Sequence, residues 1–575
     1  MKDWPIYSEQ TQCQDCYKCV RACPVKAIRV NAGHARVIPE SCIACGACVS
    51  ACPSGAKRTR NDLERVEALL RSRRPVVASL APSFRSEFHD LEPGQLIAAL
   101  KALGFQAVSE TALGAEQVSA HLAQALDQEK GRLWISTACP AAVDLVSKFL
   151  PHLTPHLTPF ASPLQAHARL LQEHFGPEVA VVFLGPCIAK KLEVAPGHPL
   201  VAALTFEELR QWMEQRGIHP TRLPLGLPAA FEPYPAAEGA LYPLEGGMAE
   251  ATALSLARPH TRFVALSGTA HILSALEELP ETTDRNIFLE LLACQGGCVC
   301  GPKARRKAPV QARMQVLDAV RPLDQLYPRQ PAIPIDRSFP SMAIPNPVHP
   351  EGRIQATLQS LGKRGTEDEL NCGACGYETC RDLATAILAE RAEARMCVSN
   401  LRRQAEKQAN ALLRTLPFGV VVVDEHLKII ESNEQFISIL GEDARLVQAS
   451  QPGLAGASLE KCIDFADRFR EVLRSGEEII REDIQSAGLT LNTTIFTVEA
   501  HRVVGALLQD VTATEQRHRQ IIEKAEEVIQ NMLANAQEIA FSLGKNAARS
   551  EGILNSIIAE FGGQDGRSGI GRRGR

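Results

Sequence analysis

Apolar runs that end beside a cysteine are the main pattern of the first half of the chain. Three such runs stand far apart in the sequence and carry four cysteines between them. The runs are WISTACPAAV, VVFLGPCIAKKLE and FLELLACQGGCVCGP, and their cysteines are Cys139, Cys187, Cys294 and Cys298. The pattern sets these four cysteines apart as a group.

The last third of the chain shows a different pattern, in which strand-like and helical stretches follow one another. From Leu416 the segment LPFGVVVVDEHLKIIESNEQFISILGED predicts a strand, a turn, a second strand and then short helices. Further along, TLNTTIFTVEA and VVGALLQDVT predict more strands. We place one domain at residues 416–513.

A long helix is predicted after Thr512, ending near Phe561, with 514–563 as its expected range. Apolar residues recur along it at alternating steps of three and four, which is the seam of a coiled coil. They are Ile522, Ala525, Ile529, Met532, Ala536, Ile539 and Leu543. A homodimer formed through this helix and the preceding domain is one interpretation. A helix that packs on its own domain is the other.

Proline-rich and charged stretches separate the predicted domains. Residues 331–350 hold six prolines without helical periodicity and predict a semi-rigid linker. Residues 401–415 are charged and alanine-rich and predict a linker helix. The tail at 564–575 is rich in Gly and Arg, so we expect it to be disordered.

Composition narrows the class of protein. At 575 residues the chain has room for about three to five domains. Its formal net charge of -4 gives no general attraction to nucleic acid. Its first residues show no apolar stretch of signal-peptide length, and nowhere do about 18 uninterrupted apolar residues occur, so we expect a cytoplasmic protein with no membrane and no nucleic-acid partner. Its 18 cysteines are clustered, and in a reducing cytosol clustered thiols are more often metal ligands or catalysts than disulfides.

Eight cysteines near the N-terminus form two copies of the pattern C-x2-C-x2-C-x3-C-P. In this run three thiolates hold one 4Fe–4S cluster, and the fourth ligates the cluster of the other repeat. One set is then Cys13, Cys16, Cys19 and Cys52, and the other is Cys42, Cys45, Cys48 and Cys23. Residues 1–58 resemble two-cluster ferredoxins, which implies a ferredoxin-like fold and electron transfer. Two zinc knuckles are the alternative, but they do not explain the repeated fourth cysteine and proline.

A third group of cysteines has the spacing C-x2-C-x4-C-x16-C, within a domain expected at 351–400. Its members are Cys372, Cys375, Cys380 and Cys397. The residues between the last two are rich in Ala, Leu and Arg and lack Pro and Gly, which predicts a helix that returns the last ligand. The group resembles the small helical iron–sulfur domain found beside electron-transfer and corrinoid-linked proteins, which implies another 4Fe–4S cluster. A zinc site is the alternative.

The three cysteine-bearing runs of the first half resemble, in order, the signatures of the catalytic domain of FeFe hydrogenases. Agreeing segments are APSFRSEF at 81–88, LGFQAVSETALGAE at 103–116 and LEGGMAEAT at 244–252. The resemblance implies an α/β hydrogenase domain at 59–330, preceded as in that family by the ferredoxin-like domain. The whole chain is then a multidomain α/β and α+β protein.

The same resemblance implies an H-cluster. Its 4Fe–4S cubane would be held by Cys139, Cys187, Cys294 and Cys298. Cys298 would also bridge to a two-iron subsite that carries carbon monoxide, cyanide and a dithiolate amine. Buried cyanide needs hydrogen-bond donors, and the family's positions for them are held by Pro82, Ser83 and Lys190.

Two carboxylates are expected to support this site. Glu193 would fix Lys190 or its loop, and Glu290 would fix the last cysteine loop. For Lys190 taken alone, a solvated surface lysine is the alternative.

Several positions depart from the family. Ordinary members have a proton-relaying cysteine where this chain has Ala138, which offers no exchangeable proton. Acidic relay residues are also missing, because no Asp or Glu stands between Glu116 and Asp127. Two methionines that commonly pack on the two-iron subsite are replaced by Gly185 and Leu292. The cavity is therefore expected to differ on several sides.

Two other side chains are candidates for the proton path. Thr158 stands where the family usually offers a hydroxyl, and Cys300 follows the bridging Cys298 by two residues, where its thiol is a candidate replacement. An ordinary satisfied hydroxyl and an inert buried thiol are the alternatives. Cys462 is interpreted as structural.

Residues 416–513 resemble a PAS domain, through Gly-Val-Val-Val-Val-Asp, Ile-Glu-Ser-Asn-Glu and the closing Gln-Asp-Val-Thr. The resemblance implies ligand sensing or dimerisation, with an unidentified PAS ligand. His426 and His501 are interpreted as surface histidines. No kinase, phosphatase or DNA-reading motif follows, so an unidentified signalling output protein would receive the signal.

These features predict a hydrogen-sensing FeFe hydrogenase with H2 and protons as substrates. Turnover would be slow because general acid–base assistance contributes about 10²–10⁴ in rate, and the relay is incomplete. The 4Fe–4S clusters would relay electrons, and the PAS module would receive the signal. The alternatives are a catalytic hydrogenase coupled to a redox partner such as ferredoxin, and a non-catalytic iron–sulfur electron carrier that lacks the two-iron subsite.

Overall fold

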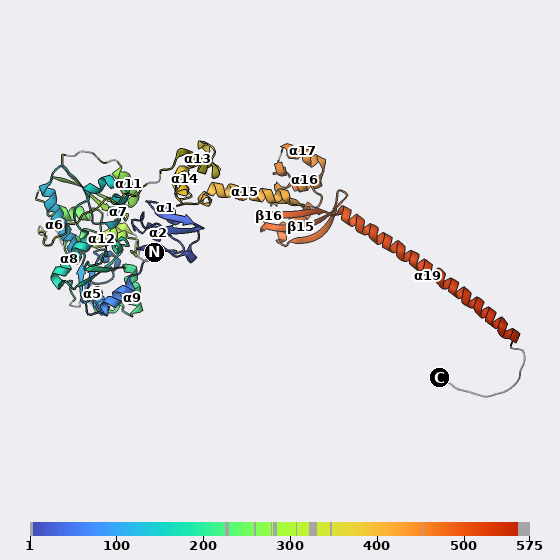
Figure 1. Ribbon diagram of the computed structural model, residues 1–575, viewed down its shortest axis with the longest axis horizontal. Coiled ribbons are helices and arrows are strands. Elements are labelled where there is room, and N and C mark those ends of the chain that lie inside the picture. Colours follow the sequence, from blue (N-terminus) through green and yellow to red (C-terminus); the bar gives the residue numbers. More distant parts are fainter. Residues whose placement is uncertain are drawn as a thin grey trace, which may run out of the picture. The chain divides into compact units, whose positions relative to one another are not determined.

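The structure, a computed structural model, describes residues 4–224, 229–257, 260–277, 279, 284–305, 308–320, 330–345, 348–450 and 452–561. It divides into two compact units, Met1–Leu401 and Arg402–Arg575, which are described separately. Figure 1 shows the helices and strands along the chain. The tail at 564–575, predicted to be disordered, lies outside the described residues.

The N-terminal part of the first unit consists of two antiparallel strand pairs and two short helices. β1 pairs with β4, and β2 pairs with β3. The strands are β1 (Ile6–Ser8), β2 (Ile28–Asn31), β3 (His34–Val37) and β4 (Lys57–Thr59). The helices α1 (Lys18–Ala22) and α2 (Ala47–Ala51) carry the third cysteine of each repeat. Tyr17 and Gly46, just before them, adopt left-handed backbone angles, so the chain turns sharply between the second and third cysteines.

A four-stranded parallel sheet of order β6-β5-β8-β9 forms the larger core of the first unit. Its strands are β5 (Val76–Leu80), β6 (Ala107–Glu110), β8 (Ala180–Gly185) and β9 (Leu200–Thr205). Every residue in them is buried, as expected of a parallel sheet covered by helices. The helices that share its core are α3 (Leu63–Leu70), α5 (Pro93–Ala102), α8 (Pro163–Phe175) and α9 (Phe206–Gln215).

A second parallel sheet has three strands in the order β10-β11-β7. They are β7 (Leu133–Ile135), β10 (Thr261–Ser267) and β11 (Asn286–Leu292). The other helices of this part are α4 (Phe84–Glu87), α6 (Ala112–Gln128), α7 (Pro140–Phe149), α10 (Gly247–Ala253), α11 (Thr269–Leu276) and α12 (Pro309–Ala319). Leu122 of α6 and Ala251 of α10 cluster with Phe288 of β11. The predicted α/β class of this part is confirmed.

The stretch predicted to be a semi-rigid linker, 331–350, packs along the first unit where the structure describes it. Ala161 N donates to Ile335 O at 2.7 Å, and Met342 N donates to Ser147 O at 2.9 Å. Ile335 is fully buried. Proline excludes a helix here, but an extended chain with paired main-chain groups and buried side chains tolerates it.

Three helices accompany the third group of cysteines, namely α13 (Glu351–Ser360), α14 (Cys380–Leu388) and α15 (Val398–Thr415). The helix predicted between the last two cysteines ends early, at Leu388, so its second half was wrong. Beyond it Glu390 has a φ of 55°, and Arg391 O accepts a hydrogen bond from Val30 N of β2 at 2.9 Å. Pairing with the N-terminal sheet outweighs the helix propensity of this segment.

The second unit is built around a five-stranded antiparallel sheet of order β13-β12-β16-β15-β14. The strands are β12 (Gly419–Asp424), β13 (Ile429–Ser432), β14 (Ile479–Ser486), β15 (Leu489–Glu499) and β16 (Val503–Asp510). Its helices are α16 (Glu434–Leu440), α17 (Glu442–Ser450) and α18 (Ala466–Ser475). Phe436 and Phe469 cluster with Val421 and Ile495 of the sheet. The predicted strands are confirmed, and β14 was missed because IIREDIQS mixes apolar and charged residues.

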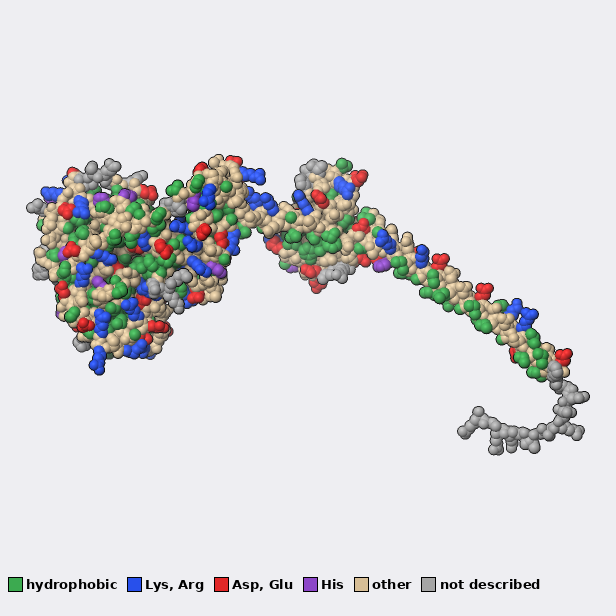
Figure 2. All heavy atoms as spheres, in the orientation of Figure 1, with side chains coloured by type: hydrophobic (Ala, Val, Ile, Leu, Met, Phe, Trp, Pro, Cys, Tyr) green, Lys and Arg blue, Asp and Glu red, His purple; other side chains and the backbone are tan. Residues whose placement is uncertain are grey.

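The C-terminal helix α19 (Thr512–Phe561) is 50 residues long, as predicted. Residues 516–560 are all exposed in the single chain, so the helix does not pack on its own domain over this length. Figure 2 shows hydrophobic side chains spread along it.

Candidate metal centres

The carboxyl ends of four parallel strands bring the predicted site residues of the first unit together. Just beyond these ends stand Ser83 (β5), Cys139 (β7), Cys187 (β8) and Cys294 (β11). Parallel strands of one sheet end at the same edge, where α/β folds hold their ligands. Because both sheets contribute residues to the same cavities, the site lies between them.

Four cysteines border one cavity in this place. Its walls include Cys139, Cys187, Cys294 and Cys298, together with Cys45 from the N-terminal part. Burial raises the pKa of Cys187 to about 11, and it also raises the pKa of Cys294 and Cys298. Neighbouring thiols add to each shift because like charges repel. These three thiols resist deprotonation and need a cation nearby to become thiolates, and an iron cluster supplies it.

A second cavity, of about 90 Å³, shares three of these cysteines with the first. Its other walls include Pro82, Ser83, Ala138 and Lys190. The Ser83 hydroxyl is buried and has no hydrogen-bond partner among the described residues. Leaving a buried donor unpaired costs about 1–3 kcal/mol, so this hydroxyl suits a bound acceptor atom. The donors present therefore fit the cyanide ligands of a two-iron subsite.

Lys190 is held at the wall of this cavity by two contacts. Its Nζ donates to the Glu193 carboxylate at 3.0 Å and to the main-chain oxygen of Ala138 at 3.3 Å. The side chains of Lys190 and Glu193 are 12% and 6% exposed, so Lys190 is not a solvated surface lysine. An ammonium has three N–H donors, and these two bonds leave one for a ligand in the cavity.

Residues 74–302, which contain this site, match the family model of the iron only hydrogenase large subunit, C-terminal domain. The chain carries a hydrogenase-like domain. Residues 5–53 match a 4Fe-4S dicluster domain, and residues 368–399 match the FeS model, which describes an Fe-S cluster. The three matches support 4Fe–4S clusters in this protein, and the hydrogenase match indicates an oxidoreductase.

Solved structures that match part of the chain include an FeFe-hydrogenase described by the oxygen inactivation of its H cluster, at 16% identity and a TM-score of 0.39. A variant of HydA1 from Chlamydomonas reinhardtii is 18% identical, with a TM-score of 0.38. Each alignment covers 49% of this chain and 100% of the other. The PAS domain of nitrogen regulation protein NR(II) from Vibrio parahaemolyticus is 18% identical, over 18% of this chain and 96% of its own, with a TM-score of 0.15. No curated protein matches the chain.

No helix among the described residues is long and apolar enough to cross a membrane.

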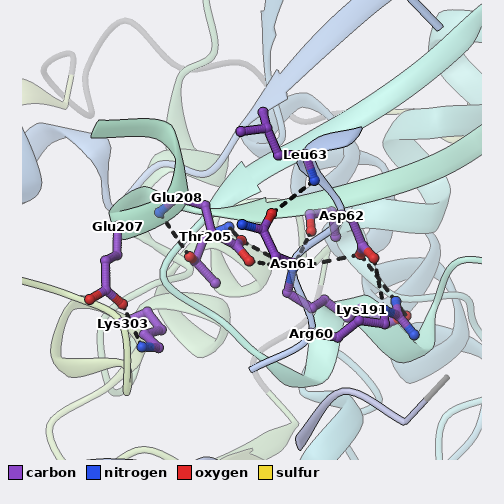
Figure 3. Close-up of polar contacts among 10 residues, drawn as sticks. Arg60, Asn61, Asp62, Leu63, Lys191, Thr205, Glu207, Glu208 and Lys303 are labelled. Carbon is purple, nitrogen blue, oxygen red and sulfur yellow. Dashed lines mark hydrogen bonds and ion pairs between the residues drawn. The ribbon is translucent and has the colours of Figure 1, made fainter. Parts of the chain in front are cut away.

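A buried ion cluster fixes the loop that carries Lys190 in the hydrogenase-like domain (Figure 3). Lys191 is fully buried, bonds the Glu208 carboxylate at 3.0 Å and lies 3.6 Å from the Asp62 carboxylate. Arg60 pairs with Asp62 at 2.8 Å and donates to the main-chain oxygen of Lys191 at 3.3 Å. Lys191 was missed because nothing in AKKLE ranks one of two adjacent lysines above the other.

Glu290 does not lie where it was expected. Its carboxylate accepts hydrogen bonds from Gly246 N at 3.2 Å and from Ala249 N at 2.9 Å. It therefore holds the first turn of α10 instead of the last cysteine loop. Burial raises the pKa of Glu290 to about 7.

The two remaining cysteines lie outside the cavities. Cys300 packs with Val299 and with Val316 of α12, and it lines neither cavity of the hydrogenase-like domain. Its placement favours the inert thiol over a replacement for the missing relay. Cys462 packs on the core of the second unit and donates to Ser458 O at 3.5 Å.

The positions that depart from the family reshape the cavity wall. A side chain at Gly185 would meet the Phe183 ring, which lies 2.3 Å from where a Cβ would stand. Phe183 and Leu292 both line the cavity. Thr158 is fully buried and bonds the Thr137 hydroxyl at 2.7 Å, so it is a satisfied polar group.

Two buried hydroxyl networks beside the cavity were not predicted, because isolated Ser, Thr and Tyr residues form no motif. In the first, Tyr242 lines the cavity and lies 2.9 Å from the Ser119 hydroxyl, to which Thr252 donates at 3.5 Å. Burial raises the pKa of Tyr242, so its phenol stays protonated.

The second network contains a histidine. Thr111 lines the cavity and lies 2.7 Å from the Ser79 hydroxyl, which lies 2.8 Å from His167 Nδ1. His167 Nε2 lies 2.9 Å from the Ser109 hydroxyl. Burial lowers the pKa of His167 to about 3, so the ring is neutral and spans two strands of the sheet.

The N-terminal part brings together both predicted sets of cysteines. One cavity is lined by Cys23, Cys42, Cys45 and Cys48, so the fourth ligand comes from the other repeat. In the other set, burial raises the pKa of Cys19, and the nearby Cys13, Cys16 and Cys52 raise it further. The buried Lys57 acts against the shifts at both Cys19 and Cys48, which places its charge between the two sets.

The third group also meets in one cavity, whose walls include Cys372, Cys375, Cys380 and Cys397. The cap of α14 explains the local fold, because Thr379 Oγ1 accepts from Asp382 N at 3.0 Å and Asp382 accepts from Thr379 N at 3.0 Å. This reciprocal pair begins the helix at Cys380, at the wall of the cavity.

The three iron–sulfur parts are in contact with one another. Cys45 lines both the N-terminal cavity and the cavity of the hydrogenase-like domain. Arg21 donates to Cys16 O at 2.9 Å and to Ala374 O at 2.8 Å, so it ties a ferredoxin-type ligand loop to the third group. The N-terminal part therefore contacts both the hydrogenase-like domain and the third group of cysteines.

Proposed function

We propose that this protein senses hydrogen through slow chemistry at an H-cluster in the hydrogenase-like domain. The observation that carries the proposal is the 90 Å³ cavity, where the unpartnered Ser83 hydroxyl, Lys190 and Cys298 border the same space as Ala138. Donors for anionic ligands are present there, and the relaying thiol is not.

The cubane of this cluster would be held by Cys139, Cys187, Cys294 and Cys298. Cys298 would bridge it to the two-iron subsite with carbon monoxide, cyanide and a dithiolate amine. When bound, that subsite supplies the iron at which H2 is converted to two protons and two electrons, and the reverse. Lys190 and Ser83 would donate hydrogen bonds to cyanide, and Glu193 keeps Lys190 oriented. Because Ala138 cannot carry a proton outward, proton movement is slow.

The second unit would receive the signal. Its five-stranded antiparallel sheet with helices between the second and third strands supports a PAS module, for which the ligand is unidentified. The exposed seam of α19 supports a homodimer. Protein partners would be a redox partner such as ferredoxin and a separate output protein, in the cytoplasm.

Infrared spectra of the matured protein under hydrogen and under argon test the proposal. We expect bands of bound carbon monoxide and cyanide that change when argon is replaced by hydrogen, with turnover far below that of a hydrogen producer. Cys298→Ala, which lacks the bridging thiolate, is the control that should lose the bands. If the wild type shows no such bands, the two-iron subsite is missing, and the result supports a non-catalytic electron carrier instead.

A fast catalytic hydrogenase is the second candidate, and the Tyr242 network favours it. Tyr242, Ser119 and Thr252 form a line of hydroxyls from the cavity wall that would replace the missing thiol. Tyr242→Phe separates the two candidates: a fall in turnover supports the catalytic route, and an unchanged slow rate supports the sensor.

A further inference from the structure

A buried lysine stands beside the third group of cysteines, outside the segment 368–399 that matches the Fe–S family. Lys363 is 3% exposed and lines the cavity of those cysteines. Its Nζ donates to the main-chain oxygen of Asp368 at 2.7 Å and to the Ser399 hydroxyl at 3.1 Å. Both acceptors are neutral, so these bonds satisfy N–H groups and supply no opposite charge.

Two other buried lysines near the candidate clusters have a carboxylate partner, whereas Lys57, beside the ferredoxin-type sets, donates to two neutral oxygens as Lys363 does. Lys148 bonds Asp144 at 2.9 Å, and Lys190 bonds Glu193 at 3.0 Å. The Asp368 carboxylate is engaged elsewhere, because it accepts from Arg364 N at 2.8 Å. A buried charge is strongly unfavourable unless an opposite charge lies close. For Lys363 that opposite charge is the cluster with its four thiolates, whose ligands share its cavity.

The Ser399 hydroxyl links Lys363 to one of these ligands. Its oxygen lies 3.3 Å from Cys397 Sγ. Since that oxygen accepts from Lys363, its own O–H is available to the sulfur, because a hydroxyl is both donor and acceptor. Ser399 is the second residue of α15, so the relay ends in the first turn of that helix.

We propose that Lys363 and Ser399 form a polar relay that raises the reduction potential of the third cluster and couples its oxidation state to the first turn of α15. Reduction adds one electron to the cluster, breaks no bond and takes up no proton. A nearby positive charge and a hydrogen bond to a ligand sulfur stabilise the more negative, reduced form. Reduction strengthens the bond from Ser399 to Cys397, because the sulfur then carries more negative charge.

The potential of the third cluster tests the first half of the inference. The full chain is reconstituted anaerobically with iron and sulfide and titrated with dithionite, with the reduced clusters followed by electron paramagnetic resonance. Cys375→Ala removes the third cluster, and its difference from the wild type assigns that signal. The chemical titration uses no hydrogen and no two-iron subsite, so its outcome is independent of the infrared test above.

We expect Lys363→Met to lower the midpoint potential of the assigned signal, Ser399→Ala to lower it less, and Lys363→Arg to keep most of it. Lys407→Met, which removes an exposed positive charge of α15, is the matched control and should change nothing. Unchanged potentials in Lys363→Met and Ser399→Ala overturn the inference. If Lys363→Met does not retain the third cluster, only Ser399→Ala can be measured. An unchanged midpoint potential in Ser399→Ala is then enough to overturn the inference. Metal analysis is a further check. If Cys375→Ala contains less zinc than the wild type but the same amount of iron, the third group binds zinc and the inference is overturned.

Hydrogen exchange tests the coupling to α15. Amides at 398–401 are expected to exchange more slowly in the reduced protein than in the oxidised protein. This difference should vanish in Ser399→Ala and persist in Lys407→Met. Equal exchange in both oxidation states of the wild type overturns the coupling.

Discussion

The Lys190 ammonium donates to the main-chain oxygen of Ala138 at 3.3 Å. The contact joins the residue proposed to bind cyanide to the position where a relaying thiol is absent. Because the acceptor is a backbone carbonyl, the side chain at 138 can be changed without removing the bond. Position 138 therefore allows the proton relay and the ligand donor to be tested separately.

Ala138→Cys is expected to raise turnover by about 10²-fold or more, since a thiol there supplies the missing exchangeable proton. The rate of hydrogen-driven dye reduction by matured protein measures it, with infrared bands confirming equal loading. Ala138→Val adds similar bulk without a proton and serves as the control. Equal rates for the Cys and Val variants would contradict the account of the missing relay.

Ser83→Ala and Ser79→Ala form a matched pair for stability. The Ser83 hydroxyl is buried without a partner, so its removal should leave the melting temperature unchanged or higher in protein that lacks the two-iron subsite. The Ser79 hydroxyl lies within hydrogen-bond distance of Thr111 and His167, and its removal should cost about 1–3 kcal/mol. Calorimetry of both variants measures the difference, and equal losses would show that Ser83 is satisfied in the protein.

The grouping of the cysteines could be predicted because their spacing determines which thiols lie together, as with Cys23 and the second repeat. Lys191 and His167 could not be predicted, because their partners come from distant segments and no local signal marks a buried ion or imidazole. The predicted length of the helix before Cys397 was too great for the same reason. Propensity describes the segment alone, whereas Val30 of a remote strand decides where the helix ends.

Lys191→Met is expected to destabilise the first unit by about 3–5 kcal/mol, because the buried carboxylate of Glu208 loses its cation, whereas Asp62 keeps Arg60. The double variant Lys191→Met with Glu208→Gln should recover part of this loss. Lys130→Met, at an exposed lysine, should stay within about 0.5 kcal/mol of the wild type. Urea unfolding measures all three, and a Lys191→Met variant as stable as Lys130→Met would contradict a structural role for the ion cluster.

His167 predicts a definite dependence of stability on pH. Its pKa is about 3 in the folded chain and near 6.5 when unfolded, so between these values the unfolded chain binds a proton that the folded chain does not. Stability from this group is therefore present above about pH 6.5 and is lost as the pH falls, with a slope approaching 1.4 kcal/mol per unit. In His167→Gln the free energy of unfolding, measured with urea, should differ less between about pH 5 and pH 7 than it does in the wild type. An equal pH dependence in both proteins would mean that the pKa of His167 does not change on folding.

The seam of α19 predicts the oligomeric state. Ile529, Met532 and Ile539 are 56%, 67% and 60% exposed, on a helix of 50 residues. The seam from Ile522 to Leu543 extends for about 33 Å along this helix, and a continuous exposed apolar seam of this length is unfavourable in water. A second copy offers an identical seam with the same heptad spacing, which makes a coiled-coil homodimer the expected state.

Charges placed in that seam should break the dimer. Ile529→Glu combined with Met532→Glu is expected to give a monomer by sedimentation equilibrium, because both copies would bury four like charges in one interface. Gln537→Glu adds a charge outside the seam of the same helix and should remain a dimer. A wild type that sediments as a monomer at micromolar concentration would show that this seam serves another protein, in which case the double variant should lose that partner and keep its folded sheet.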